Sequence, residues 1–159
     1  MPKILVVYYS RTKNTEKMAF AVAEAAKKVS NIEVNVKKVE QASLEDLLNA
    51  DGIIMGSPVY YGSMAGKLKT FIDESVKYHG KLEGKVGAAF TSSGGTATGA
   101  ETTLLSILQT MLVHGMVVQG CSDNKHYGAA AVGAPKEEDL EYCRNLGKRV
   151  ANLVIKLEK

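Results

Sequence analysis

Apolar and polar residues alternate in blocks along this chain, and the blocks predict strands and helices in turn. The first block, Ile4–Tyr9, is a continuous run rich in β-branched and aromatic residues, which is typical of a strand buried on both faces. Six polar residues, 10–15, follow it, and then Met18, Val22 and Ala26 recur at helical spacing. The chain therefore opens with a buried strand, a short polar turn and a helix.

The same alternation continues along the rest of the sequence. Further strands are predicted around 32–36, 53–56, 86–90 and 116–118, and further helices over 43–50, 64–78, 101–113 and 136–156. A short apolar stretch, Ala129–Val132, can extend the sheet. This alternation predicts one α/β domain over residues 1–159, a three-layer sandwich whose five-stranded parallel sheet has the order 2-1-3-4-5.

Three polar or glycine-rich loops leave the carboxyl ends of predicted strands one, three and four. They span 10–15, 57–62 and 91–99. In a parallel sheet of this order, ligands bind beyond the carboxyl ends of the strands, at the switch point between strands one and three. We therefore expect the three loops to converge on one pocket.

The first loop carries the groups of a phosphate site. Three hydroxyls, an amide and two cations stand directly before a helix, whose first N–H groups and positive dipole end attract anions. Ordinary helix capping uses the same residue types and is the alternative. One cap needs fewer such groups, which favours phosphate binding. The six residues are Ser10, Arg11, Thr12, Lys13, Asn14 and Thr15.

The other two loops suit a flat ring. Tyr60 and Tyr61 offer aromatic faces for stacking, although packing of a lid would use them equally well. Gly94 and Gly95 let the backbone of the third loop approach a ligand edge closely. A phosphate tail joined to a planar, hydrogen-bonding ring describes a mononucleotide.

Composition and motifs exclude several other classes of protein. The net charge of +3 comes from interspersed Lys and Glu residues, without the basic block that nucleic-acid binding needs. Apolar runs stop short of the ~18 residues of a membrane span, and residues 1–3 lead directly into the first strand, so we expect a cytoplasmic protein. Gly62–Lys67 is one residue short of a phosphate-binding P-loop, and no GxGxxG, GxSxG, HExxH or His/Cys metal cluster is present.

Five stretches carry a resemblance that covers nearly the whole chain. They are YYSRTKNTEKMA, GSPVYYGSMAGKLKTFID, FTSSGGT, HGMVV and HYGAAAVG. They resemble the tryptophan-repressor-binding-protein (WrbA-like) family of NAD(P)H:quinone oxidoreductases, which are FMN proteins with the flavodoxin-like fold. The second and third stretches are the most specific, because ordinary flavodoxins usually carry a different, acidic ring loop.

The resemblance implies FMN as cofactor, NAD(P)H as co-substrate and a quinone as electron acceptor. Residues 10–15 would hold the FMN phosphate. His114 matches a histidine that approaches FMN from a neighbouring subunit, which implies a homo-oligomer. Without the family resemblance, the interpretation is a histidine at the carboxyl end of a helix, favoured there by the helix dipole. The flavin carries the chemistry, so no catalytic side chain is implied. The remaining implied contacts, along the ring and the ribityl chain, are Pro58, Val59, Tyr60, Tyr61, Gly62, Thr91, Ser92, Ser93, Gly94, Gly95 and Thr96.

The chain also departs from the family. It contains no Trp, whereas the family carries a substrate-side tryptophan before strand four, and Tyr78 or His79 would take its place. A one-electron carrier of the flavodoxin type, docking on redox proteins, is the closest alternative function; such carriers usually present an acidic face, which the charge of +3 disfavours. A non-catalytic interaction protein that keeps the fold is the third alternative.

Overall fold

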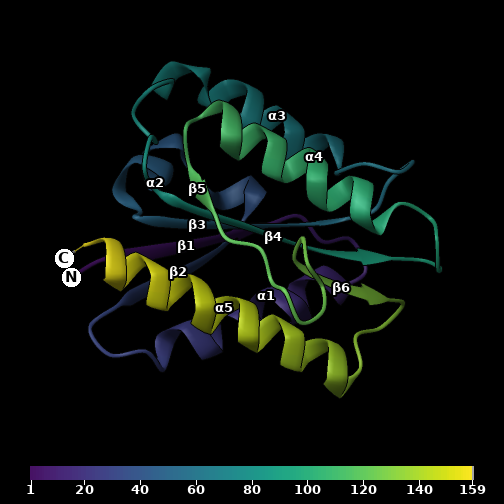
Figure 1. Ribbon diagram of the computed structural model, residues 1–159. Coiled ribbons are helices and arrows are strands. Elements are labelled where there is room, and N and C mark those ends of the chain that lie inside the picture. The colour runs from purple at the N-terminus through teal and green to yellow at the C-terminus, as the bar shows by residue number, and fades with distance from the viewer. Residues whose placement is uncertain (159) are drawn as a thin grey trace.

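A parallel sheet lies between two layers of helices, as Figure 1 shows. The computed structural model describes residues 1–158. The strands follow one another in the order β2-β1-β3-β4-β5, and β6 pairs with β4. This confirms the predicted order and the predicted extension of the sheet. The strands are β1 (Lys3–Tyr8), β2 (Glu33–Lys38), β3 (Gly52–Pro58), β4 (Val86–Ser93), β5 (Val117–Val118) and β6 (Ala129–Val132).

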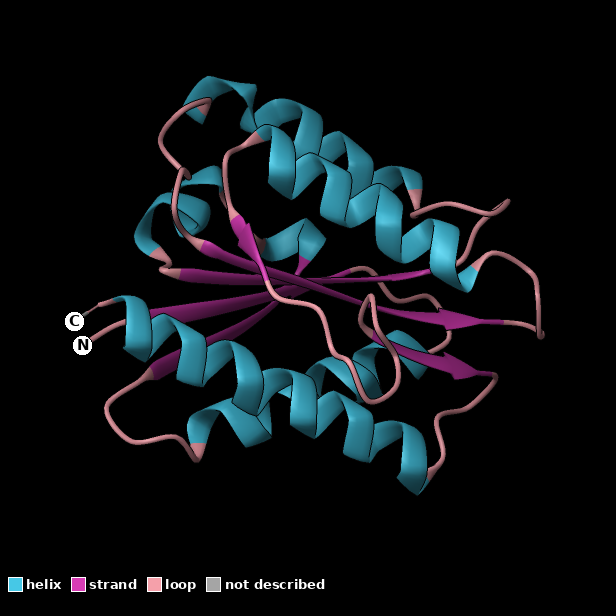
Figure 2. Ribbon diagram, in the orientation of Figure 1, coloured by secondary structure: helices cyan, strands magenta, loops and turns pink. Residues whose placement is uncertain are grey.

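Helices cover both faces of the sheet (Figure 2). Helices α1 and α5 pack on one face, and α3 and α4 pack on the other. The helices are α1 (Asn14–Lys27), α2 (Leu44–Asn49), α3 (Gly66–Glu74), α4 (Ala100–Val113) and α5 (Glu137–Leu157), with 3-10 turns η1 (Val39–Gln41) and η2 (Ser75–Tyr78). None of the helices within residues 1–158 is long and apolar enough to cross a bilayer.

The first strand shows why its sequence is apolar at every position. Ile4 and Val6 belong to the core against α1 and α5, whereas Leu5 and Val7 belong to the core against α3 and α4. Side chains alternate between the faces of a strand, so a strand in the middle of a three-layer sandwich needs apolar residues on both.

Strands β3 and β4 are longer than the sequence predicted. Ser57 and Pro58, predicted as loop, end β3, and Thr91–Ser93, also predicted as loop, end β4. Pro58 is tolerated because its neighbour Val59 supplies the N–H that donates to Ser92 O (2.8 Å). The hydroxyl-rich end of β4 is buried because its polar groups are bonded, for example Thr91 Oγ1 to Ser57 O (2.7 Å).

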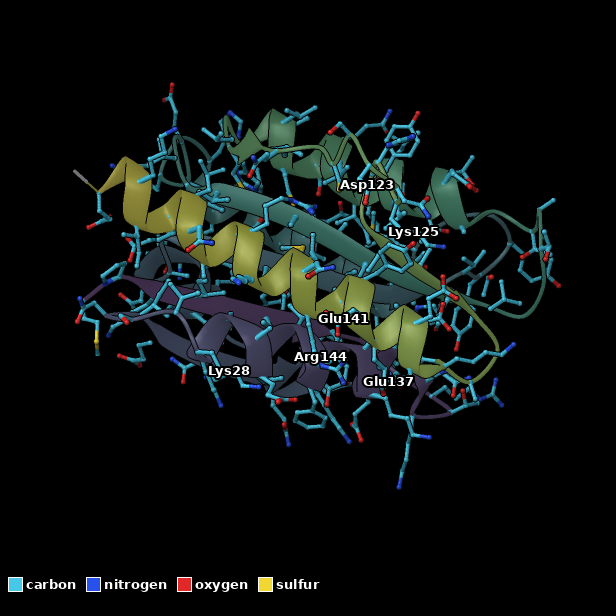
Figure 3. All side chains as sticks on the ribbon, turned by 60° about the horizontal axis from the view of Figure 1, so that its bottom comes forward. Lys28, Asp123, Lys125, Glu137, Glu141 and Arg144 are labelled. Atoms are coloured by element: carbon cyan, nitrogen blue, oxygen red, sulfur yellow. The ribbon has the colours of Figure 1, made fainter. Side chains whose placement is uncertain are left out.

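The ends of several helices also differ from the sequence prediction. The helix predicted over 64–78 begins at Gly66, and its last four residues form the tighter turn η2. The last helix, α5, begins one residue later than expected, at Glu137. On its outer face Arg144 donates to Glu137 (2.7 Å) and Glu141 (2.9 Å). Figure 3 labels these three side chains.

Candidate functional site

A cavity of about 460 Å³ lies where the carboxyl ends of β1, β3, β4 and β6 meet. Its volume falls within the range of about 300–1,000 Å³ that is usual for small-molecule sites. The three loops that the sequence singled out converge here, together with the residue after β6. The lining residues are Arg11, Thr12, Asn14, Thr15, Pro58, Val59, Tyr60, Ser92, Ser93, Gly94 and Gly133.

The loop before α1 forms a row of free backbone donors at one end of the cavity. Lys13, the N-cap of α1, has a φ of 71°, in the left-handed region. The N–H groups of residues 11–15 meet no acceptor within residues 1–158, whereas the next N–H, of Glu16, donates to Ser10 Oγ (3.3 Å). Successive N–H groups around a left-handed residue make a concave anion site, and the α1 dipole adds to it. The residues at this end can hold a phosphate.

The hydroxyl groups of this loop are not equivalent. Thr15 is buried, and its Oγ1 shares a hydrogen bond of 2.8 Å with the Oγ of buried Ser92. This pair joins the start of α1 to the end of β4. Ser10 Oγ accepts a hydrogen bond from Glu16 N–H (3.3 Å), which leaves its own hydrogen free to donate. Thr12 is exposed beside Arg11 at the cavity, and its hydroxyl has no hydrogen bond to any of residues 1–158, so it is available to an incoming anion.

Tyr60–Ser63, hereafter the tyrosine turn, projects from the end of β3. Tyr60 N–H donates to Ser63 O (2.9 Å) and Ser63 N–H donates to Tyr60 O (3.1 Å). Tyr61 and Gly62 both have positive φ, 48° and 76°, as in a type I′ turn. This geometry sends the two tyrosine side chains apart: Tyr60 lines the cavity, and Tyr61 is fully exposed.

The ring of Tyr60 stands against a second tyrosine. The Tyr9 and Tyr60 centroids are 6.1 Å apart, edge to face. Burial raises the pKa of Tyr60, and the neighbouring Tyr9 raises it further, while the positive charge of Arg11 partly offsets both. Tyr60 therefore keeps a neutral hydroxyl and offers an uncharged flat face at neutral pH.

The third side of the cavity is made by the end of β4 and the residue after β6. A Cβ at Gly94 would meet no atom within 4 Å, which leaves open space for a ligand beside the backbone. Gly133 N–H donates to Ser93 O (2.7 Å), which brings the end of β6 to the cavity. The sequence prediction missed Gly133, although it ends the stretch HYGAAAVG that carried part of the resemblance.

Comparisons with known proteins assign the family. Residues 36–125 match the family described as NADPH-dependent FMN reductase. The chain is 39% identical to a protein of Archaeoglobus fulgidus named NAD(P)H dehydrogenase (quinone), over 99% of this chain and 100% of that protein. The chain belongs to the NADPH-dependent FMN reductase family. A further relative in Aquifex aeolicus, named flavodoxin, is 43% identical over 97% of this chain and 88% of that protein.

Solved structures support the same assignment within the FMN reductase family. The flavodoxin, WrbA-like protein from Agrobacterium tumefaciens superposes with a TM-score of 0.84 at 30% identity, covering 98% of this chain and 99% of that one. A flavodoxin from the domain Archaea gives a TM-score of 0.79 at 30% identity, covering 96% and 99%. The resemblance to WrbA-like proteins and the flavodoxin-like fold are therefore confirmed.

Several residues that the family resemblance implied do not line the cavity. Thr91 is fully buried inside the sheet, and Tyr61 faces solvent on the tyrosine turn. The complete set of implied residues outside the lining is Ser10, Lys13, Tyr61, Gly62, Thr91, Gly95, Thr96 and His114. Their roles toward a cofactor remain sequence-based predictions.

His114 lies at the opposite end of the sheet from the cavity, shortly before β5 begins. Helix α4 begins near the cavity and runs 14 residues away from it, about 21 Å, and His114 follows its last residue. His114 Nε2 is 2.7 Å from Ser75 Oγ, and its ring lies 5.8 Å from that of His79. Tyr78, at the same end, donates to Glu45 Oε1 (2.8 Å). Within one chain, His114, Tyr78 and His79 are all remote from the cavity.

Proposed function

We propose that the chain is an FMN-dependent oxidoreductase that transfers two electrons from NAD(P)H to a quinone. The row of acceptor-free N–H groups at residues 11–15, beside a cavity with room for a ring, carries the proposal. The family and the relatives named NAD(P)H dehydrogenase (quinone), at 39% and 37% identity, supply the reaction class.

The lining fits the two ends of FMN. The N–H groups of residues 11–15, the Thr12 hydroxyl and the Arg11 guanidinium would hold the phosphate. Tyr60 would flank the ring, while the backbone from Ser92 to Gly94 would meet the ribityl chain and the pyrimidine edge. Bound FMN supplies the ring that accepts and returns a hydride.

The chain's own part in this reaction is to bind and orient. The eleven lining residues include no His, Asp or Glu, so no side chain of the cavity is placed to act as a general base. Tyr60 keeps its proton, and the free backbone N–H groups stabilise negative charge without proton transfer. The side of a bound ring away from Tyr60 would be open to nicotinamide and quinone in turn.

A one-electron carrier is the second candidate. Relatives in Aquifex aeolicus and Clostridium saccharobutylicum, at 43% and 36% identity, are named flavodoxin. A carrier would bind FMN equally well, but it would exchange electrons with proteins rather than oxidise NAD(P)H.

Steady-state turnover distinguishes these functions. The purified chain, reconstituted with FMN and kept free of dioxygen, should turn over NADH or NADPH only when a benzoquinone is present. Comparison of the two nucleotides gives the preferred donor. Binding of FMN without oxidation of NAD(P)H would exclude the oxidoreductase activity and favour the one-electron carrier. A chain that cannot be loaded with FMN would exclude both and leave an interaction protein.

We also propose a homo-oligomer, in which the partner's His114 approaches the cofactor. Leu112 and Val113, in the turn of α4 before His114, are exposed and apolar, as an association surface requires. Light scattering coupled to size exclusion should give a multiple of 17.1 kDa. A monomer would remove the proposed role of His114. The cytoplasmic location remains a proposal from the sequence.

A further inference from the structure

Thr102, in the first turn of α4, makes a contact that differs from those of the other hydroxyls on this helix. Its Oγ1 lies 2.6 Å from Gly62 O in the tyrosine turn and 3.0 Å from Gly99 O. A hydroxyl has one hydrogen to donate, and the shorter contact is the one to Gly62. Ser106 and Thr110, by contrast, donate to carbonyls of α4 itself. Thr102 therefore ties α4 to a loop forty positions earlier in the sequence.

The backbones of the two segments also touch. Gly99 has a φ of 118°, and a Cβ there would lie 2.6 Å from Gly62 Cα and 3.2 Å from Thr102 Oγ1. Only glycine permits both the backbone angle and this approach. The residues before α4 therefore support the tyrosine turn directly.

The tyrosine turn needs such support. Tyr61 holds a φ of 48°, which a residue with a Cβ adopts at a cost, and its fully exposed side chain contributes no packing. The two hydrogen bonds between Tyr60 and Ser63 close the turn on itself but do not attach it to the rest of the protein. The Thr102 hydroxyl supplies that attachment.

We propose that Thr102 is a positioning residue of the FMN site. Its hydroxyl holds the carbonyl of Gly62, which fixes the tyrosine turn and with it the ring of Tyr60 at the cavity wall. This role rests on the proposed function, because Tyr60 is the side chain assigned to flank the flavin. Thr102 itself does not line the cavity and acts only through the turn.

The decisive variant is Thr102→Val, which keeps the shape of the side chain and removes the donor. In the cofactor-free chain, amide hydrogen exchange at Tyr60 and Ser63 should accelerate, since the turn loses an anchor. FMN affinity should fall about three- to tenfold, in line with loss of one neutral hydrogen bond. The visible circular dichroism of bound FMN should change as well, because the flanking ring moves.

Two further variants complete the experiment. Thr102→Ser restores the donor and should recover the exchange rates, the affinity and the dichroism. Thr70→Val is the matched control, because Thr70 is an exposed helical threonine whose hydroxyl donates to Gly66 O within α3 (3.0 Å). Its exchange rates, FMN affinity and dichroism should equal those of the unmodified chain.

Each negative result would contradict a different claim. Equal FMN affinity and equal dichroism in Thr102→Val and the unmodified chain would overturn the positioning role and leave the proposed function standing. Loss of affinity that Thr102→Ser does not recover would overturn the role of the hydroxyl. An unmodified chain that binds no FMN would overturn the proposed function, and the positioning role with it.

Discussion

Thr12 and Thr15, at the start of α1, show how burial decides what one hydroxyl does. Thr12 is exposed at the cavity, and its hydroxyl bonds to none of residues 1–158, whereas Thr15 is buried and paired with Ser92. Thr12→Val should therefore weaken FMN binding about tenfold or more, since a hydrogen bond to a charged group contributes about 1.5–3 kcal/mol. Titration of the cofactor-free chain with FMN, followed by flavin fluorescence, measures this.

The control for Thr12 is its neighbour. Thr15→Val leaves the Ser92 hydroxyl buried without its partner and should lower the free energy of unfolding by about 1–3 kcal/mol. Thr12→Val should leave that free energy unchanged. If Thr12→Val bound FMN as tightly as the unmodified chain, the phosphate would lie elsewhere.

Residue types at the site were predictable from the sequence, but the directions of their side chains were not. Two adjacent tyrosines predict an aromatic wall, and only the backbone angles of Tyr61 and Gly62 decide that Tyr60 alone forms it. In the same way, the sequence does not show that Thr15 Oγ1 shares a hydrogen bond with Ser92 Oγ, or that Ser10 Oγ accepts one from Glu16 N–H.

At the scale of elements, the contact between α1 and α5 depends on one glycine. A Cβ at Gly147 would lie 2.0 Å from Val22 O, a backbone atom that cannot rotate away. Gly147→Ala should therefore force the helices apart and lower the free energy of unfolding by about 2–3 kcal/mol, as overpacking does. Urea unfolding gives the value.

Gly66→Ala is the matched control, because a Cβ at the first residue of α3 meets nothing within 4 Å. It should be neutral or slightly stabilising, as alanine is the better helix former. If Gly147→Ala also left the free energy of unfolding unchanged, the close approach of α1 to α5 would be contradicted.

Element types followed from the sequence pattern, whereas the ends of β3 and β4 did not. Proline and hydroxyl residues are typical of loops, so Ser57–Pro58 and Thr91–Ser93 were predicted outside the strands. In the structure the two segments pair with each other, Ser57 with Thr91 and Pro58 with Ser92. Long-range pairing of this kind overrides local preference.

At the scale of the whole molecule, two histidines from distant segments give the chain a pH-sensitive contact. Burial, and then the charge of nearby His79, lower the pKa of His114 below its ordinary value of 6.5. The unfolded chain therefore takes up a proton at His114 more readily than the folded chain. The contribution of neutral His114 to the free energy of unfolding is fully present above about pH 6.5. It should be lost as the pH falls from there toward the folded-state pKa of His114.

Urea unfolding measured between about pH 8 and pH 5 detects this loss. His114→Gln should flatten the curve in that window. Glu16 and Asp46, whose pKa values are also lowered, act in a lower window, below about 4.5, and serve as an internal reference. A curve unaffected by His114→Gln would mean that His114 titrates alike in both states.

The order of the sheet and the edge that carries the site were predictable, because alternating strands and helices allow few topologies. The proposed role of His114 cannot be tested within one chain, since α4 carries it to the end of the sheet opposite the cavity. That role would require a second copy of the chain.

The central claim is that the loop before α1 holds the phosphate of FMN. A crystal structure of the chain grown with excess FMN tests it most directly. We expect phosphate oxygens within hydrogen-bond distance of the N–H groups of residues 11–15, and the flavin ring beside Tyr60. A cavity that stays empty in those crystals, or a flavin bound elsewhere, would contradict the account.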